Sequence, residues 1–131
     1  MKRAVGIAAV ALLIFDVAWP LTYRALPAGG NVLFVAITIA NMMIPFAAAF
    51  VIARQASIRS AVVASSALGA LDATIGWAIS RSIAPELQEE PLTLWAVLTT
   101  IPLVVLTYAA VGTVAALIGR RLRKPREAPA R

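Results

Sequence analysis

Four long runs of apolar residues, separated by short polar segments, dominate the pattern along the chain. The runs cover about 4–23, 32–53, 61–80 and 92–118. At about 1.5 Å of rise per residue, each is long enough to cross a hydrocarbon core of roughly 30 Å as a helix. The pattern therefore predicts an all-α membrane protein. In it, residues 1–118 form a four-transmembrane-helix bundle and residues 119–131 form a basic cytoplasmic tail.

The segments between the apolar runs carry turn and cap signals. Pro27 and the glycines that follow it predict a tight turn after the first run. Asn31 and Ser60 have side chains that are favoured at helix N-caps, so we expect the second and third helices to begin there. Residues 81–91 form the longest connection and are too few for a domain of their own. All four helices therefore belong to one domain.

The amino-acid composition also indicates that the protein is surrounded partly by lipid. Of the 131 residues, 61% are hydrophobic, and the mean hydropathy is +0.87, whereas soluble domains are about half apolar. The basic residues behind the net charge of +6 lie almost entirely between or after the apolar runs. This placement favours anionic lipid headgroups over nucleic acid as their partner. We therefore expect the bilayer as the main partner, with the basic tail on its headgroups, and no nucleic acid.

Lysine and arginine are distributed very unevenly between the two ends of such a bundle. One end carries only Arg24 and Arg81, beside the glutamates of the connection at 81–91. The other end carries all the remaining basic residues, which are Lys2, Arg3, Arg54, Arg59, Arg120, Arg121, Arg123, Lys124, Arg126 and Arg131. Loops rich in lysine and arginine stay cytoplasmic. The sequence thus predicts a multi-pass protein of the plasma (inner) membrane with both termini in the cytoplasm (N-in and C-in).

The two halves of the chain resemble each other at a few positions. The matching pairs are Asp16 with Asp72, Trp19 with Trp77, Arg24 with Arg81 and Pro45 with Pro102. Their offsets stay within about 56 to 58 residues, which is what an old duplication of a two-helix hairpin would leave. Because each half contains an even number of spans, the two repeats would be parallel, related by an axis along the membrane normal.

Two aspartates interrupt the apolar runs. Asp16 lies about 12 residues, or roughly 18 Å, into its predicted helix, beyond the midplane toward the outside, and Asp72 lies at a similar depth. A charged side chain without a partner costs roughly 2.5–3.5 kcal/mol of insertion free energy there, so we expect polar neighbours. Asp72 and Arg81 are nine residues apart, which places them on opposite sides of a regular helix. We therefore do not expect these two residues to pair.

Three roles remain open for the two aspartates. They accept hydrogen bonds from polar neighbours such as Tyr108 and lock helix packing, or they face each other and share a proton. In the third role they line a polar path for a proton or small cation. Trp19 shares a face with Asp16, so its indole N–H is placed to hold that carboxylate. The candidate intramembrane polar site comprises Asp16, Asp72, Asn41, Trp19 and Thr38.

Small residues and prolines mark where helices approach each other and where they bend. Steps of three and four place small residues on one side of the third and fourth helices, where they allow close approach. The predicted helix-packing face is Ser65, Gly69, Gly76, Ser80, Gly112 and Ala116. Pro45 and Pro102 each remove a backbone donor, which predicts a kink in the second and the fourth helix. The alternative is that the carbonyls freed by these prolines ligate a cation.

The residue types that are missing exclude most enzyme mechanisms. The chain has no cysteine and no histidine, so it lacks thiol catalysis, the commonest general base and the usual transition-metal ligands. It also contains no glycine-rich phosphate loop after a strand and no metal-ligand spacing. We therefore expect neither an enzyme nor a cofactor or metal site.

Two non-catalytic functions remain. The Ala- and Gly-rich faces and the short loops favour an accessory, assembly or regulatory subunit that acts through helix packing, in a homo-oligomer or a larger membrane complex. The alternative is a small oligomeric transporter or channel, linked to protons or cations, that uses Asp16 and Asp72. The cytoplasmic half of each predicted helix consists largely of Ala, Val, Leu and Ile, so no continuous polar line extends inward. For that reason the sequence ranks transport second.

Overall fold

The computed structural model describes residues 1–26, 30–85 and 93–122, and the elements in these ranges are helices. They are α1 (Lys2–Ala25), α2 (Gly30–Gln55), α3 (Ile58–Leu71), η2 (Asp72–Gly76), α4 (Trp77–Ile83) and α5 (Leu94–Arg121). The element η2 is a π-helix, and Asp72 and Trp77 at its boundaries both keep right-handed helical dihedrals. For this reason α3, η2 and α4 form one continuous rod.

Four rods in the described ranges are long and apolar enough to cross a membrane. They are Lys2–Ala25, Asn31–Gln55, Ile58–Ile83 and Leu94–Arg121, with 24, 25, 26 and 28 residues. At about 1.5 Å per residue, even the shortest exceeds a hydrocarbon core of about 30 Å. This confirms the predicted all-α architecture with four membrane-length helices, which is compatible with a small membrane protein. Most of the predicted basic tail, residues 123–131, lies outside the described residues.

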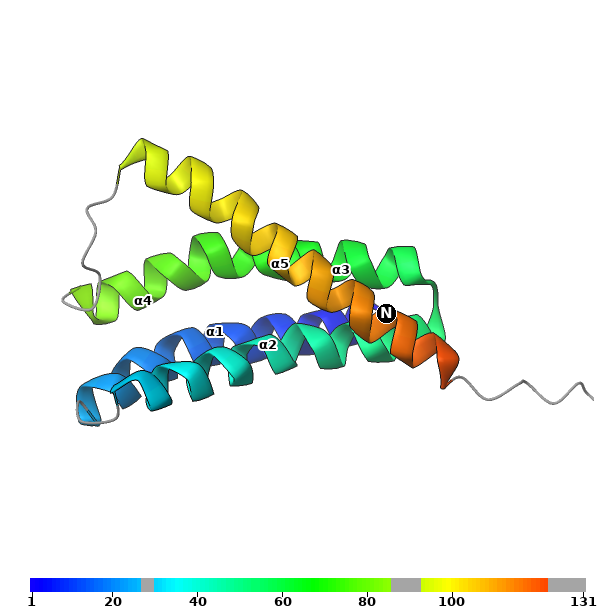
Figure 1. Ribbon diagram of the computed structural model, residues 1–131, viewed down its shortest axis with the longest axis horizontal. Helices are drawn as coiled ribbons and strands as arrows, with labels where there is room; N and C mark the ends of the chain where they lie inside the picture. The colour runs from blue at the N-terminus through cyan, green and yellow to red at the C-terminus, as the bar shows by residue number, and fades with distance from the viewer. Residues whose placement is uncertain (27–29, 86–92, 123–131) are drawn as a thin grey trace, which may run out of the picture.

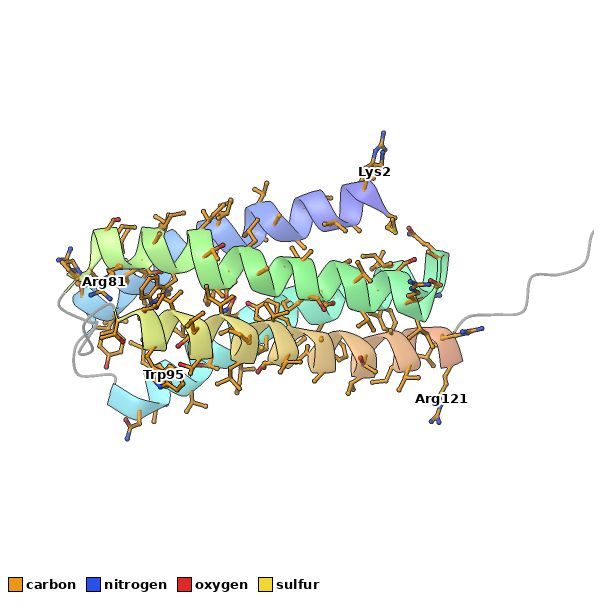
Figure 2. The ribbon with its side chains drawn as sticks, turned by 90° about the horizontal axis from the view of Figure 1, so that it is seen from above. Lys2, Arg81, Trp95 and Arg121 are labelled. Carbon is orange, nitrogen blue, oxygen red and sulfur yellow. The ribbon has the colours of Figure 1, made fainter. Side chains whose placement is uncertain are left out.

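The two ends of the bundle differ in charge. The N-terminus and the end of α5 lie at the same end (Figure 1). Figure 2 shows Lys2 and Arg121 at this terminal end, and Arg81 and Trp95 at the opposite, loop end.

Helix α5 packs along α2 and α3, whereas α1 packs on α2 and α4. Toward the loop end, the first half of α5 diverges from α4 (Figure 1).

Small residues build the core of the terminal half of the bundle. One buried cluster there consists of Ala49, Ile52, Ala53, Ala61, Ala64, Ala115 and Ala116. A Cβ atom added to Gly112 would lie 2.5 Å from the Ser65 Cβ, and one added to Gly119 would lie 2.7 Å from the Phe50 carbonyl oxygen. Because lipid tails are as apolar as the side chains, such close van der Waals contact is what holds helices together in a membrane.

The predicted packing face is buried within this single chain. Its residues Ser65, Gly69, Gly76, Ser80, Gly112 and Ala116 are all buried. Gly69 of α3 faces Tyr108 of α5, whose Cβ would lie 2.8 Å from an added Cβ, and Gly76 of η2 faces Asp16 of α1. These small residues therefore bring helices of the same chain together.

The outer surface of the bundle is strongly apolar. Ile7, Val32 and Trp95 are 71%, 81% and 75% exposed, and large side chains project outward along the rods (Figure 2). A water-facing surface of this kind would mark a binding patch or an aggregation site. In a bilayer it would contact acyl chains, as the apolar runs predict.

Two helices begin earlier than their cap signals predict. The N-cap of α3 is Ser57, whose Oγ accepts a hydrogen bond from the Ser60 N–H at 3.0 Å. The prediction that Ser60 caps this helix is wrong, because Ser57 satisfies the free N–H groups from one turn earlier. Helix α2 begins at Gly30, so Asn31 lies inside its first turn.

Candidate functional site

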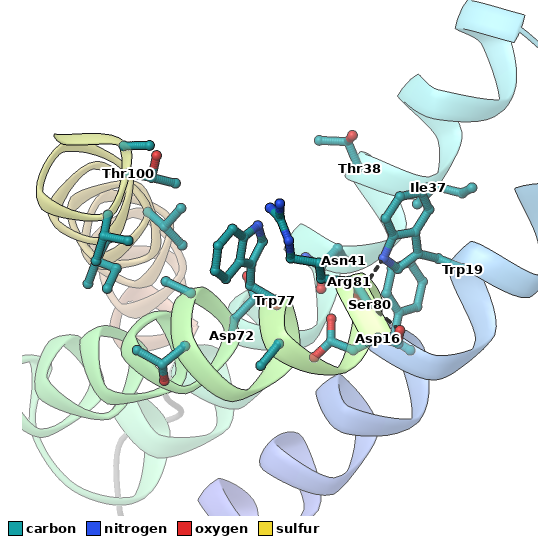
Figure 3. A pocket seen from close by; sticks show the side chains of 18 of the residues that line it. Asp16, Trp19, Ile37, Thr38, Asn41, Asp72, Trp77, Ser80, Arg81 and Thr100 are labelled. Carbon is teal, nitrogen blue, oxygen red and sulfur yellow. Dashed lines mark hydrogen bonds between the residues drawn. The ribbon is translucent and has the colours of Figure 1, made fainter. Parts of the chain in front are cut away.

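A half-open cavity of about 720 Å³ lies in the loop half of the bundle, between α1, α2, the η2–α4 segment and the first half of α5. Figure 3 shows its walls. Its polar and tryptophan lining residues are Asp16, Trp19, Thr38, Asn41, Asp72, Thr74, Trp77, Ser80, Arg81 and Thr100. All five residues of the predicted polar site are among them. The structure thus brings together side chains that come from α1, α2 and η2.

The carboxyl group of Asp16 is buried at the cavity wall. The residue is 4% exposed, and its Oδ2 atom has no hydrogen-bond partner. A Cβ added to Gly76 would collide with this Oδ2 and lie 2.7 Å from the Asp16 Cγ. Only glycine at position 76 therefore leaves room for the carboxyl group where α1 crosses η2.

Asp72 stands at the start of η2 and is the centre of a group of polar side chains. It interacts with Asp16, Asn41 and Tyr108. Three buried oxygen atoms in this group, Asp16 Oδ2, Asn41 Oδ1 and Tyr108 Oη, have no partner in hydrogen-bond geometry. Buried polar atoms are nearly always satisfied, and each exception needs an explanation. Asp16 and Asn41 line the cavity, so two of these atoms belong to its wall. Ser65 Oγ, which does not line the cavity, is a fourth buried oxygen atom without a partner.

A proline explains the contact between α1 and α4. Pro20 has no N–H, so it leaves the carbonyl of Asp16, four residues earlier, without its helical donor. The Ser80 hydroxyl donates to this carbonyl at 3.0 Å and accepts a hydrogen bond from Trp19 Nε1 at 3.1 Å (Figure 3). The prediction that the Trp19 indole holds the Asp16 carboxylate is wrong, because Ser80 takes its N–H. The sequence signal that was missed is the proline four residues after Asp16.

The π-helix explains why Arg81 lines the same cavity as Asp72. In a regular helix their nine-residue separation places them on opposite sides. A π turn inserts one extra residue into the helix. The angle around the helix axis between Asp72 and Arg81 is therefore about 100° smaller than in a regular α-helix. The expectation of opposite faces is therefore wrong. The Arg81 Cζ atom lies 5.3 Å from the centre of the Trp77 ring, a cation–π distance.

The remaining predicted residues have simpler surroundings. The Thr38 hydroxyl donates to the Phe34 carbonyl within its own helix, at 2.9 Å. Pro45 and Pro102 lie inside α2 and α5, and both helices continue past them. The kinks and the alternative of cation-ligating carbonyls stay predictions.

The arrangement suits reversible binding of positive charge. Two neighbouring carboxylates in an apolar surrounding cannot both be ionised cheaply, so they hold a proton between them or a cation in its place. Within residues 1–26, 30–85 and 93–122, no group of three His, Cys, Asp or Glu side chains is arranged to hold a metal ion. The described site therefore offers two carboxylates and no third acidic ligand.

Comparisons with known proteins add no relative to this picture. No family model, no curated protein and no solved structure matches the chain.

Proposed function

We propose that this protein is a small secondary transporter that exchanges protons for a monovalent cation at the Asp16–Asp72 pair. One observation carries the proposal: both intramembrane aspartates line a half-open cavity of about 720 Å³. Aspartates that served only to lock helices would be sealed by protein donors. Asp16 Oδ2 is buried and has no partner in hydrogen-bond geometry, and the polar neighbour with which the Asp16 side chain interacts is a second carboxyl group, that of Asp72.

The closed terminal half supports a transporter over a channel. A channel needs a continuous path, whereas the terminal half is filled by the alanine-rich cluster around Ile52 and Ala116. A cavity reached from one end only is what one state of an alternating-access transporter presents, with the binding site near the middle of the membrane. In this proposal the helices rearrange to open the terminal end.

The distribution of basic residues supports a cavity that opens to the outside. Lys2, Arg54 and Arg121 belong to the terminal end, while the loop end has Arg24 and Arg81 as its basic residues. By the positive-inside rule, the terminal end is cytoplasmic and the cavity opens to the outside of the plasma (inner) membrane.

The role of an accessory subunit has less support. It was motivated by small-residue faces available to a partner, and the faces around Gly69, Gly76 and Gly112 are occupied by helices of the same chain. The proposed site is also formed within one chain, so a homo-oligomer or a larger complex is not needed for binding.

The test is cation-driven proton movement in reconstituted vesicles. Purified protein is placed in vesicles that contain a pH-sensitive dye, and Na⁺, K⁺, tetramethylammonium or benzyltrimethylammonium is added outside. We expect at least one cation to make the interior more alkaline, because protons leave as the cation enters. Asp16→Asn and Asp72→Asn should each reduce the rate at least about tenfold, which corresponds to about 1.4 kcal/mol.

The matched control is Ser66→Ala. The Ser66 hydroxyl donates to the Val62 carbonyl within α3 and does not line the cavity, so this variant should transport at the wild-type rate. Wild-type vesicles that respond to none of the four cations more than empty vesicles do would overturn the proposal. An unchanged rate in both aspartate variants would overturn it as well.

A further inference from the structure

We propose that the cation bound in this cavity is organic and monovalent: an amine or quaternary ammonium group that carries an aromatic or branched apolar substituent. This inference rests on the proposed function, since it takes the Asp16–Asp72 pair as the cation site. It goes further by naming the chemical class of the ligand and by excluding bare alkali ions and divalent cations as the preferred ones.

The size of the cavity is the first argument. A volume of about 720 Å³ lies within the roughly 300–1,000 Å³ of pockets that bind small organic molecules. A single water molecule takes about 30 Å³ of liquid volume, so a proton or an alkali ion would leave the cavity almost empty. The space therefore fits a ligand with an organic body.

The chemistry of the walls is the second argument. Most of the lining is apolar or aromatic, and the apolar part includes Phe15, Phe34, Ile37, Val97, Ile101 and Val104. An alkali ion must exchange its hydration shell for several oxygen ligands, and most of these lining residues have no side-chain oxygen. An organic ammonium group has no such coordination requirement, and its substituent gains from apolar and aromatic surroundings.

The buried Asp16 side chain points to the place of the positive charge. It is 4% exposed, it lines the cavity, and its Oδ2 atom has no hydrogen-bond partner. Figure 3 shows the carboxyl groups of Asp16 and Asp72 at the same side of the cavity. A positively charged group beside them would leave no uncompensated charge buried. A protonated amine would also donate a hydrogen bond to Oδ2, whereas a quaternary ammonium group would neutralise the charge alone.

The tryptophans supply cation-binding surfaces. The Trp77 ring already makes a cation–π contact within the protein, since the Arg81 guanidinium carbon lies 5.3 Å from the ring centre. Trp19 directs its indole N–H to Ser80 and is also part of the cavity wall. Aromatic rings attract ammonium groups through their negative faces, and quaternary ammonium ligands are commonly recognised in this way.

Counting the charges that face the site explains why one positive charge is preferred. Asp16 from α1 and Asp72 from η2 are acidic, Arg81 from α4 is basic, and α2 contributes the uncharged Asn41 and Thr38. Tyr108 from α5 interacts with Asp72 behind this lining and adds no basic group. With both carboxylates ionised, Arg81 and one monovalent cation make the site neutral. Without the ligand, one proton on the aspartate pair does the same. One cation thus exchanges for one proton, which leaves for the solution, and a dication would leave an excess positive charge in an apolar site.

The test is equilibrium binding to the purified protein in lipid nanodiscs, followed by tryptophan fluorescence and calorimetry. The probes are benzyltrimethylammonium, tetramethylammonium and Na⁺. We expect benzyltrimethylammonium to bind at least about tenfold more tightly than tetramethylammonium, because only its benzyl group uses the apolar walls. Asp16→Asn should weaken its binding at least about tenfold. The affinity should also fall as the pH is lowered, because protons compete for the same carboxylates.

Two tryptophan variants form a matched pair. Trp77→Leu removes a ring from the cavity wall, whereas Trp95→Leu removes an exposed ring that is not part of it. We expect only Trp77→Leu to weaken benzyltrimethylammonium binding, by about fivefold or more, in line with the loss of a cation–π contact. Thermal unfolding without ligand shows that each variant is folded before its affinity is compared.

The outcomes separate this inference from the proposed function. Equal affinities for benzyltrimethylammonium and tetramethylammonium, or an affinity unchanged by Asp16→Asn, overturn the inference. If Na⁺ or K⁺ drives proton flux while benzyltrimethylammonium does not bind, the ligand class is wrong and transport stands. If benzyltrimethylammonium binds at the aspartates and no cation drives flux, the ligand class stands and the protein is a binding protein without transport.

Discussion

The terminal half and the loop half of this bundle are built from the same four helices, yet they pack in opposite ways. In the terminal half, alanine and glycine let the backbones approach closely, as Gly119 does against Phe50 and Gly112 against Ser65. In the loop half, α5 diverges from α4 (Figure 1) and a cavity of about 720 Å³ lies between the helices. The terminal half holds the helices together, and the loop half gathers polar side chains around a cavity.

Both halves contain buried polar atoms without a hydrogen-bond partner, since Ser65 Oγ in the terminal half is one of them, but those beside the cavity belong to a carboxyl and an amide group. Asp16 Oδ2 and Asn41 Oδ1, both beside the cavity, have no hydrogen-bond partner. Leaving buried polar atoms unsatisfied costs stability, and proteins retain such costs mainly at functional sites. The π turn of η2 also indicates a functional site beside the cavity, because π-bulges occur frequently at such sites. The terminal half thus supplies stability and the loop half supplies the binding site. Mutations in the two halves should therefore affect different properties.

The largest change in stability is expected from a substitution that overpacks the terminal half. Gly112→Val places side-chain atoms where Ser65 already lies and should push α3 and α5 apart. We expect a loss of about 1–3 kcal/mol in the free energy of unfolding, the usual cost of overpacking, measured by thermal or denaturant unfolding in detergent. Gly6→Val is the matched control, because an added Cβ there meets nothing within 4 Å. Equal losses in both variants would contradict the close α3–α5 packing.

A second substitution should affect the loop half with less effect on stability. The Cβ introduced by Gly76→Ala would collide with the Asp16 carboxyl group, which would have to leave its present position. We expect affinity for benzyltrimethylammonium to fall about tenfold, or about 1.4 kcal/mol, while unfolding changes less than in Gly112→Val. Calorimetric titration of Gly76→Ala beside Gly6→Ala measures this. Wild-type affinity in Gly76→Ala would show that the position of the Asp16 carboxyl group does not matter for binding.

The smallest effect is expected at the contact between α1 and α4. Ser80→Ala leaves the Asp16 carbonyl without a donor and Trp19 Nε1 without an acceptor, which should cost about 1 kcal/mol of unfolding free energy. Pro20→Ala restores the backbone N–H that reaches this carbonyl. We therefore expect Ser80→Ala to cost less in the Pro20→Ala background, and a double-mutant cycle of unfolding free energies measures the difference. Strictly additive effects would show that Ser80 does not compensate for the proline.

The candidate site was predictable as a set of residues and not as a geometry. Asp16, Asp72 and Asn41 stand out in a sequence because polar side chains are costly inside an apolar helix. Their convergence on one cavity depends on how α1, α2 and η2 cross, which no local pattern encodes. The role of Arg81 was misjudged for a related reason. A π turn changes every angular relation beyond it, and the sequence carries no reliable signal for one.

The amino-acid sequence by itself determined the four membrane-length helices, because hydropathy and length depend only on neighbouring residues and on the thickness of a bilayer. It also determined which residues are small enough for close packing, such as Gly112. Only the tertiary structure decided that the terminal half is closed, that the loop half holds a cavity, and that Ser80 satisfies the carbonyl that Pro20 frees. Those features arise where helices distant in sequence meet, and their energies depend on distances and angles that exist only after the helices have packed.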